Sequence, residues 1–214
     1  MKSLLITHIG LLPTIFELLL FTGAIFVYFF AKRKEFVAKC FIGGGVVFYL
    51  FYPFLLSVLQ YLKWAADSTL GKAFLTLPLD PATPCPEWLR PLFMHEHGYF
   101  LFYILGRFWL HAVLAVVGAF LFYLLLQMIR RAKPYTIDPL ESLIGFILAL
   151  ALGWPGILIF ILLTFVFVFL HSLFNTLLKK PRTRIMVALF LAFVFAALLP
   201  TFFKNLLHLT VLII

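Results

Sequence analysis

Long runs of hydrophobic residues, separated by short charged clusters, dominate the chain. A membrane-spanning helix needs about 20 apolar residues, because the hydrocarbon core is about 30 Å thick and a helix rises about 1.5 Å per residue. At this length the pattern predicts six spans, at about residues 9–31, 36–62, 98–128, 139–154, 156–178 and 185–203. We therefore expect an all-α, polytopic membrane protein with a single membrane domain, residues 1–214.

The fourth and fifth spans are separated at a predicted break. The apolar run from Leu143 to Leu178 has 36 residues, and as one helix it would measure about 54 Å. Even a tilted helix of that length is too long for one crossing. Proline and glycine interrupt helices, and tryptophan favours the membrane interface. The sequence Gly153-Trp154-Pro155-Gly156 thus predicts where the chain turns back.

Composition and charge agree with this pattern. Hydrophobic residues make up 64% of the chain and charged residues 12%, which excludes a soluble globular domain. The net charge is +9, and most Lys and Arg residues form three clusters between spans. The clusters are Lys32, Arg33, Lys34 and Lys39; Arg130, Arg131 and Lys133; and Lys179, Lys180, Arg182 and Arg184. The positive-inside rule makes these cytoplasmic loops, so both the N-terminus and the C-terminus lie outside.

The same charge distribution bears on partners and location. Cations confined to short loops between spans are typical of membrane orientation and do not indicate a nucleic-acid partner. We expect membrane lipids and other membrane protein subunits as partners. The expected location is the cytoplasmic (inner) membrane of a prokaryote, with several crossings.

One long connection, residues 63–97, lies outside in this topology. Five prolines between Pro78 and Pro91 exclude a regular helix across that part. The connection is either a lid packed over the helices or a docking loop, because loops on rigid scaffolds often carry function. It contains Cys85, whereas Cys40 stands near the inner end of the second span, so the two cysteines cannot pair.

Two ionisable residues stand deep inside predicted spans. Glu17 and Arg107 lie eight and nine residues from the outer ends of spans one and three, which places them about 12 and 14 Å deep. They can form an ion pair that fixes the two helices, or line a path for a proton or substrate. His111 follows Arg107 by four residues, on the same face of an α-helix. The three residues form a predicted polar intramembrane site.

Histidines suggest two further ligand sets. His111 and His171 stand in different spans and could be the axial ligands of a b-type haem, although an isolated histidine is more often a packing residue. A haem-bearing membrane anchor of a quinone oxidoreductase is thus an alternative function. On the outer side, His95 and His97 stand near Glu96 and Cys85, with His8 and His208, and are candidate metal ligands.

Two short motifs predict local structure. Asp138-Pro139-Leu140-Glu141 has the acidic N-cap, the first-turn proline and the N3 glutamate of a capping box. The run Gly43-Gly44-Gly45 lies inside an apolar span, where small residues allow helices to approach closely.

From Glu141 to about Leu199 the chain has an acidic helix start, a Leu-rich span that ends in Ala151-Leu152-Gly153-Trp154-Pro155, a return span, the basic loop Lys179 to Ile185 and a final span. This order resembles the last three helices of prepilin peptidases, intramembrane aspartyl proteases that cut type IV pilin leader peptides. The resemblance covers under a third of the chain, about residues 139–200. It implies a membrane peptidase fold in which Asp138 or Glu141 takes the place of a catalytic acid.

The chain departs from that family in its catalytic motifs. The glycines of the family's GxGDxK motif are absent, Leu143 replaces its basic residue, and Glu35 is the only acid that could supply the second carboxylate. Aspartyl chemistry needs two carboxylates that share a proton. We therefore expect an integral membrane subunit or accessory protein without catalytic activity, and a divergent prepilin-peptidase-like protein is the second alternative.

Overall fold

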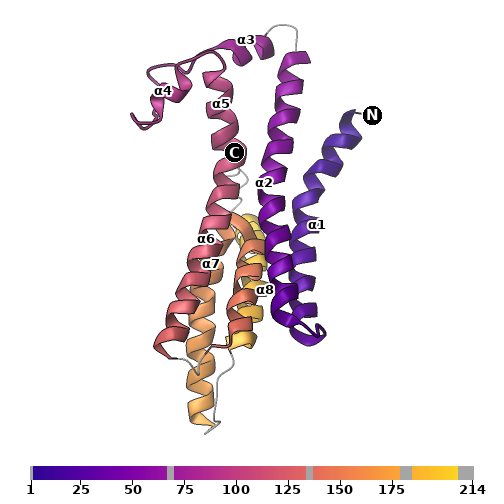
Figure 1. Ribbon diagram of the computed structural model, residues 1–214, viewed down its shortest axis with the longest axis vertical. Coiled ribbons are helices and arrows are strands. Elements are labelled where there is room, and N and C mark those ends of the chain that lie inside the picture. The colour runs from indigo at the N-terminus through magenta and orange to yellow at the C-terminus, as the bar shows by residue number, and fades with distance from the viewer. Residues whose placement is uncertain (1, 67–69, 134–136, 179–184, 207–214) are drawn as a thin grey trace. The chain divides into compact units, whose positions relative to one another are not determined.

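The computed structural model describes residues 2–66, 70–133, 137–178 and 185–206, and these residues are helical or in turns, without strands. Figure 1 labels the helices along the chain. They are α1 (Lys2–Phe29), α2 (Lys34–Ala66), α3 (Leu70–Thr76), α4 (Arg90–Phe93), α5 (Gly98–Ile104), the π-helical turn η1 (Leu105–Trp109), α6 (Leu110–Ala132), α7 (Pro139–Leu177) and α8 (Ile185–Leu206). The predicted all-α class is confirmed for the described residues.

Four helical stretches among the described residues are long and apolar enough to cross a membrane. They are Leu11–Phe29 of α1, all of α2, the continuous run Gly98–Ala132 and α7. A shorter apolar stretch, Ile185–Leu199, belongs to α8. The chain is therefore a membrane protein by the length and composition of its helices. The number of crossings and the side on which the termini lie remain predictions.

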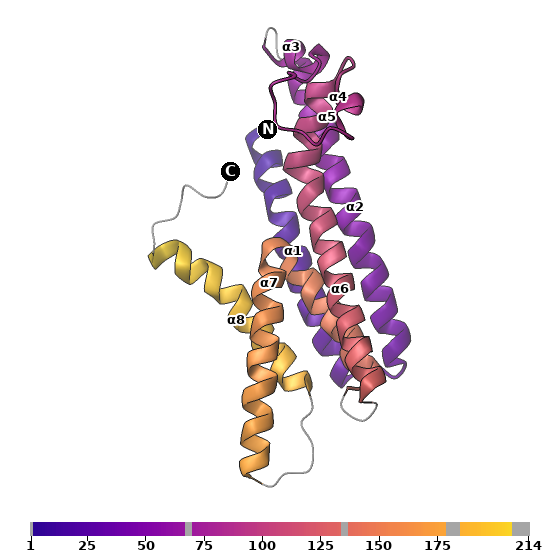
Figure 2. The ribbon, with the colours of Figure 1, turned by 90° about the vertical axis from the view of Figure 1, so that its left-hand side faces the viewer.

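The predicted break is present in α7. Gly153 has φ 59° and ψ −173°, and Trp154 has an extended backbone, so neither residue is helical. Positive φ favours glycine, which has no Cβ to clash. Figure 2 shows the two arms of α7 folding back from this bend. The local signals of glycine and proline thus located the turn correctly.

The chain contains two compact units, residues 1–46 with 114–214 and residues 47–113. The first contains α1, the beginning of α2, most of α6, α7 and α8. The second contains the rest of α2, the connection with α3 and α4, and α5, η1 and the beginning of α6.

The first arm of α7 is the core of the first unit. Every residue from Glu141 to Ala151 is buried, which is typical of a helix surrounded by other helices. Helices α8 and α1 make the most extensive contacts with α7. Small residues allow this close packing: Ala188, Ala192 and Ala196 recur every fourth residue on α8 and are at most 1% exposed.

A glycine on the core arm faces buried side chains of α6. A Cβ built on Gly145 would lie 2.8 Å from Leu126 Cδ1 and 3.3 Å from Phe122 Cε1. Both of these α6 side chains are buried. In turn, Gly118 of α6 faces Ile157, just after the bend in α7, and a Cβ added to this glycine would lie 3.1 Å from Ile157 Cδ1. Glycines on both helices therefore set the distance between α6 and α7.

In the second unit the long connection packs on helix ends. Leu75 of α3 is buried with Phe100 and Ile104 of α5, and Trp64 at the end of α2 packs against this cluster. Backbone hydrogen bonds fix the connection, from Tyr99 N–H to the Leu77 carbonyl and from Leu79 N–H to the Phe93 carbonyl. The described part of the connection therefore packs on the helix ends around Leu75, whereas Trp88 is 78% exposed, and both the lid and the docking-loop interpretations stay open.

Candidate functional site

The predicted intramembrane cation lies in an irregular turn. Arg107 is the third residue of η1, where the Leu110 N–H donates to the Leu105 carbonyl, five residues back. Its side chain is exposed, and within residues 47–113 it makes no hydrogen bond or ion pair. π-Helical turns inside α-helices occur frequently at functional sites. The sequence predicted the depth of this residue but not the shape of the backbone that presents it.

A hydrogen bond between two helices holds this turn. Trp109 Nε1–H donates to Ser57 Oγ over 3.2 Å, and the Ser57 hydroxyl donates to the Pro53 carbonyl over 2.7 Å. Ser57 is buried. Pro53 lies inside α2 and cannot donate a helical hydrogen bond. The hydrogen bond from Trp109 to Ser57 therefore joins α2, one turn after Pro53, to the π turn between α5 and α6.

His111 stands just after the π turn that contains Arg107. Arg107 lies in η1 and His111 is the second residue of α6. Both side chains are exposed. That the two residues share one face of the helical run stays a prediction.

Glu17 is an exposed residue of α1 in the first unit. Arg107 belongs to the second unit, so an ion pair between them remains a prediction. The same holds for the two proposed haem ligands, because His111 belongs to the second unit and His171 to the first. His171 is partly exposed near the end of α7. Binding of haem b by these histidines stays a hypothesis.

The candidate metal ligands lie at the start of α5. The Nδ1 of His97 is hydrogen bonded to the Leu75 carbonyl, so Nδ1 must carry the proton because a carbonyl only accepts. His97 has φ 71°, in the left-handed region, and His95 is exposed. Among the described residues, no group of three or more His, Cys, Asp or Glu side chains could hold a metal ion. His97 therefore has a structural contact of its own, while His208 lies outside the described residues.

The two peptidase-like acids cap α7. The Asp138 side chain accepts from Leu140 N–H over 3.1 Å, and Glu141 Oε2 accepts from Asp138 N–H over 3.0 Å. This confirms the predicted capping box. Asp138 is exposed and Glu141 is buried. Both carboxylates thus stabilise the start of the core helix, and the basic loop 179–184 of the family resemblance lies outside the described residues.

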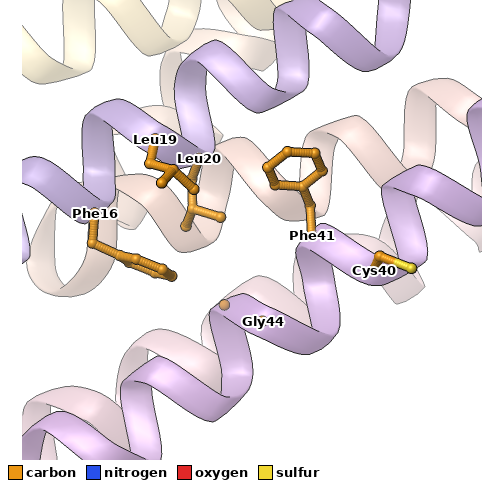
Figure 3. A pocket seen from close by; sticks show the side chains of 7 residues that line it. Phe16, Leu19, Leu20, Cys40, Phe41 and Gly44 are labelled. Carbon is orange, nitrogen blue, oxygen red and sulfur yellow. The ribbon is translucent and has the colours of Figure 1, made fainter. Parts of the chain in front are cut away.

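An apolar groove lies between α1 and α2 in the first unit, with a volume of about 210 Å³. It is lined by Phe16, Leu19, Leu20, Cys40, Phe41, Gly44 and Gly45. Figure 3 shows that Gly44 presents no side chain toward the residues of α1. Of the glycine run, only Gly45 makes the predicted close contact, 3.3 Å between an added Cβ and Leu150 Cδ2. The prediction was wrong for Gly43 and Gly44, which face open space.

Sequence reasoning did not find Ser57 or the groove. A proline in a span followed four residues later by serine was the available signal for Ser57, because such a hydroxyl can bond the carbonyl four residues back. The groove had no comparable signal, since the sequence does not tell which face of Gly44 a neighbouring helix covers. No protein-family model, curated protein or solved structure matches the chain.

Proposed function

We propose that the chain is a six-span, non-catalytic subunit or accessory protein of a membrane assembly, with an intramembrane polar site around Glu17, Arg107 and His111. In this arrangement the three basic clusters are cytoplasmic and both termini lie outside. The bend at Gly153 and Trp154 supports the six-span count, because it allows α7 to cross the membrane twice.

The observation that carries the proposal is the exposed guanidinium of Arg107. It lies inside the apolar run Gly98–Ala132, about 14 Å from the start of that run. An arginine near the centre of a spanning helix costs about 2.5–3.5 kcal/mol on insertion scales unless it is paired or hydrated. Within residues 47–113 nothing neutralises it. Arg107 therefore needs an anionic partner, supplied by Glu17 or by another subunit.

The backbone around Arg107 is suited to presenting that charge. The hydrogen bond from Trp109 to Ser57 fixes the π turn, so the backbone that carries the guanidinium has a defined position. Gly106, next to Arg107, leaves open space where a side chain would stand. A carboxylate on a neighbouring helix can then form an ion pair with the guanidinium. An ion pair of this kind can join charged helices within a membrane.

Photo-crosslinking in native membranes tests the proposal. A photoreactive residue replaces Leu110, which is 51% exposed next to η1, or Val117 as a control, which is 46% exposed farther along α6. We expect a discrete protein adduct from position 110 that Arg107→Gln abolishes and Arg107→Lys retains. A chain that forms no adduct at 110, and whose stability Arg107→Gln leaves unchanged, would contradict the proposal.

A double-mutant cycle identifies the partner of Arg107. If Glu17 is the partner, the variant Glu17→Gln/Arg107→Gln should recover most of the stability that either single change loses, because it leaves no unpaired charge. Thermal melts of the four proteins in detergent measure this. Strictly additive losses would exclude the pair and assign Arg107 to another subunit.

A further inference from the structure

The groove between α1 and α2 is lined by residues near the start of α2, which carries part of the first basic cluster. Cys40, one of its lining residues, directly follows Lys39 in α2 and lies six residues, about 9 Å, from the start of the helix at Lys34. The turn between α1 and α2 joins two helices that are long enough to cross a membrane. It therefore lies at a membrane surface, at the level of the lipid headgroups.

The charges at that end are available to a ligand. Residues 32–39 contain four cations and one anion, a net charge of +3. Lys34 is already used, because its Nζ donates to the Tyr28 carbonyl over 2.6 Å and lies over the Tyr28 ring. Lys32, Arg33 and Lys39 are exposed, and their side chains make no hydrogen bond or ion pair with the described residues.

The lining of the groove is apolar apart from the Cys40 thiol, the one sulfur among the side chains in Figure 3. The groove is open to its surroundings. Gly44 leaves space that any larger residue would fill, since an added Cβ would meet nothing within 4 Å. An apolar groove beside a helix whose first turns carry unpaired cations, at the headgroup level, matches one kind of molecule, a lipid with a negatively charged headgroup.

We infer that this groove is a binding site for an anionic phospholipid. One acyl chain lies along Phe16, Leu19, Phe41 and Gly44, and the phosphate is bound by cations of the cluster Lys32, Arg33 and Lys39. Long lysine side chains reach toward the headgroups while their stems stay on apolar surface, so Lys39 can contact the phosphate from the level of Cys40. The inference is independent of the role of Arg107.

Native mass spectrometry of the purified full chain tests the site, with equal amounts of phosphatidylglycerol and phosphatidylcholine in the micelles. The wild type should retain one phosphatidylglycerol in preference to phosphatidylcholine. Lys32→Gln/Lys39→Gln should weaken that retention about 25-fold, at roughly fivefold for each cation removed. The matched control Arg130→Gln/Arg131→Gln removes two cations from another cluster and should leave the bound lipid in place.

The apolar half of the site has its own matched pair. Gly44→Leu should fill the groove and displace the lipid, whereas Gly43→Leu, in equally open space but outside the lining, should not. Size-exclusion profiles and thermal melts confirm that both variants fold.

Labelling of Cys40 in a Cys85→Ser background tests the site without changing any residue that lines the groove. Phosphatidylglycerol, and not phosphatidylcholine, should slow the reaction of Cys40 with a maleimide severalfold.

Three results would overturn the inference. The wild type could retain the two lipids equally, or Gly43→Leu could lose as much lipid as Gly44→Leu. A lipid-independent dimer that Gly44→Leu dissociates would instead assign the groove to a second copy of the chain.

Discussion

The contact at Gly145 gives the sharpest test of the packing around the core helix. Gly145→Ala would place a Cβ 2.8 Å from Leu126 Cδ1 and 3.3 Å from Phe122 Cε1, where carbon atoms normally keep about 3.5–4.0 Å. Leu126 is 3% exposed and Phe122 1%, so either side chain would have to shift within the buried core. Overpacking of this kind costs about 1–3 kcal/mol.

The matched control is Gly43→Ala, because an added Cβ there meets nothing within 4 Å. Alanine is favoured over glycine in helices by about 0.8–1 kcal/mol, and this gain applies to both variants. We therefore expect Gly43→Ala to be neutral or stabilising and Gly145→Ala to destabilise, with a difference of about 2 kcal/mol between them. Unfolding in mixed detergent and sodium dodecyl sulfate, followed by circular dichroism, measures that difference.

A third variant links the cost to the named contact. Leu126→Val removes the Cδ1 atom that an alanine at 145 would meet. The double variant Gly145→Ala/Leu126→Val should therefore lose less stability than the sum of the single losses. The difference should be at least about 0.5 kcal/mol, roughly the smallest coupling free energy expected for residues in contact. Equal stability of Gly145→Ala and Gly43→Ala would refute the reasoning, because it would mean that α6 does not lie against Gly145.

Two other predictions concern hydrogen bonds. Ser57→Ala leaves the indole N–H of Trp109 without its acceptor and should lower the free energy of unfolding by about 1 kcal/mol. Ser142→Ala removes a buried hydroxyl that has no partner among the described residues and should be neutral or stabilising in the same unfolding assay. A larger loss for Ser142→Ala than for Ser57→Ala would contradict the assigned bonds. At the start of α7, Glu141→Ala should cost about 1 kcal/mol and Glu141→Gln less, because glutamine can also bond the Asp138 N–H, and equal losses on thermal melting would argue against the cap.

The sequence was most informative where structure depends on neighbouring residues. The bend at Gly153 and Trp154 could be predicted, because the adjacent glycine and proline act on the local backbone of an apolar run that is too long for one crossing. The capping box at Asp138 and Glu141 could be predicted for the same reason, since both of its hydrogen bonds are local. The long apolar helices followed from the thickness of the bilayer.

Features that depend on distant residues could not be predicted. The π turn at Arg107 is held by a hydrogen bond between Trp109 and Ser57, which stand 52 residues apart. No local sequence pattern predicts a hydrogen bond between residues so far apart. Gly44 and Gly45 are adjacent glycines in the sequence, but Gly45 faces Leu150 and Gly44 faces open space. Only the packed helices distinguish them, because the sequence does not determine which face of α2 is covered.

The side of the membrane on which residue 183 lies tests the six-span account most directly. If α7 crosses twice, the loop 179–184 lies in the cytoplasm with the other basic clusters, whereas a single crossing would place it outside. We replace Thr183 by cysteine in a Cys40→Ser/Cys85→Ser background and treat intact cells with a membrane-impermeant maleimide, with the native Cys85 of a Cys40→Ser chain as the external reference. The account predicts labelling of Cys85 in intact cells and of position 183 only after permeabilisation. Labelling of position 183 in intact cells would contradict it.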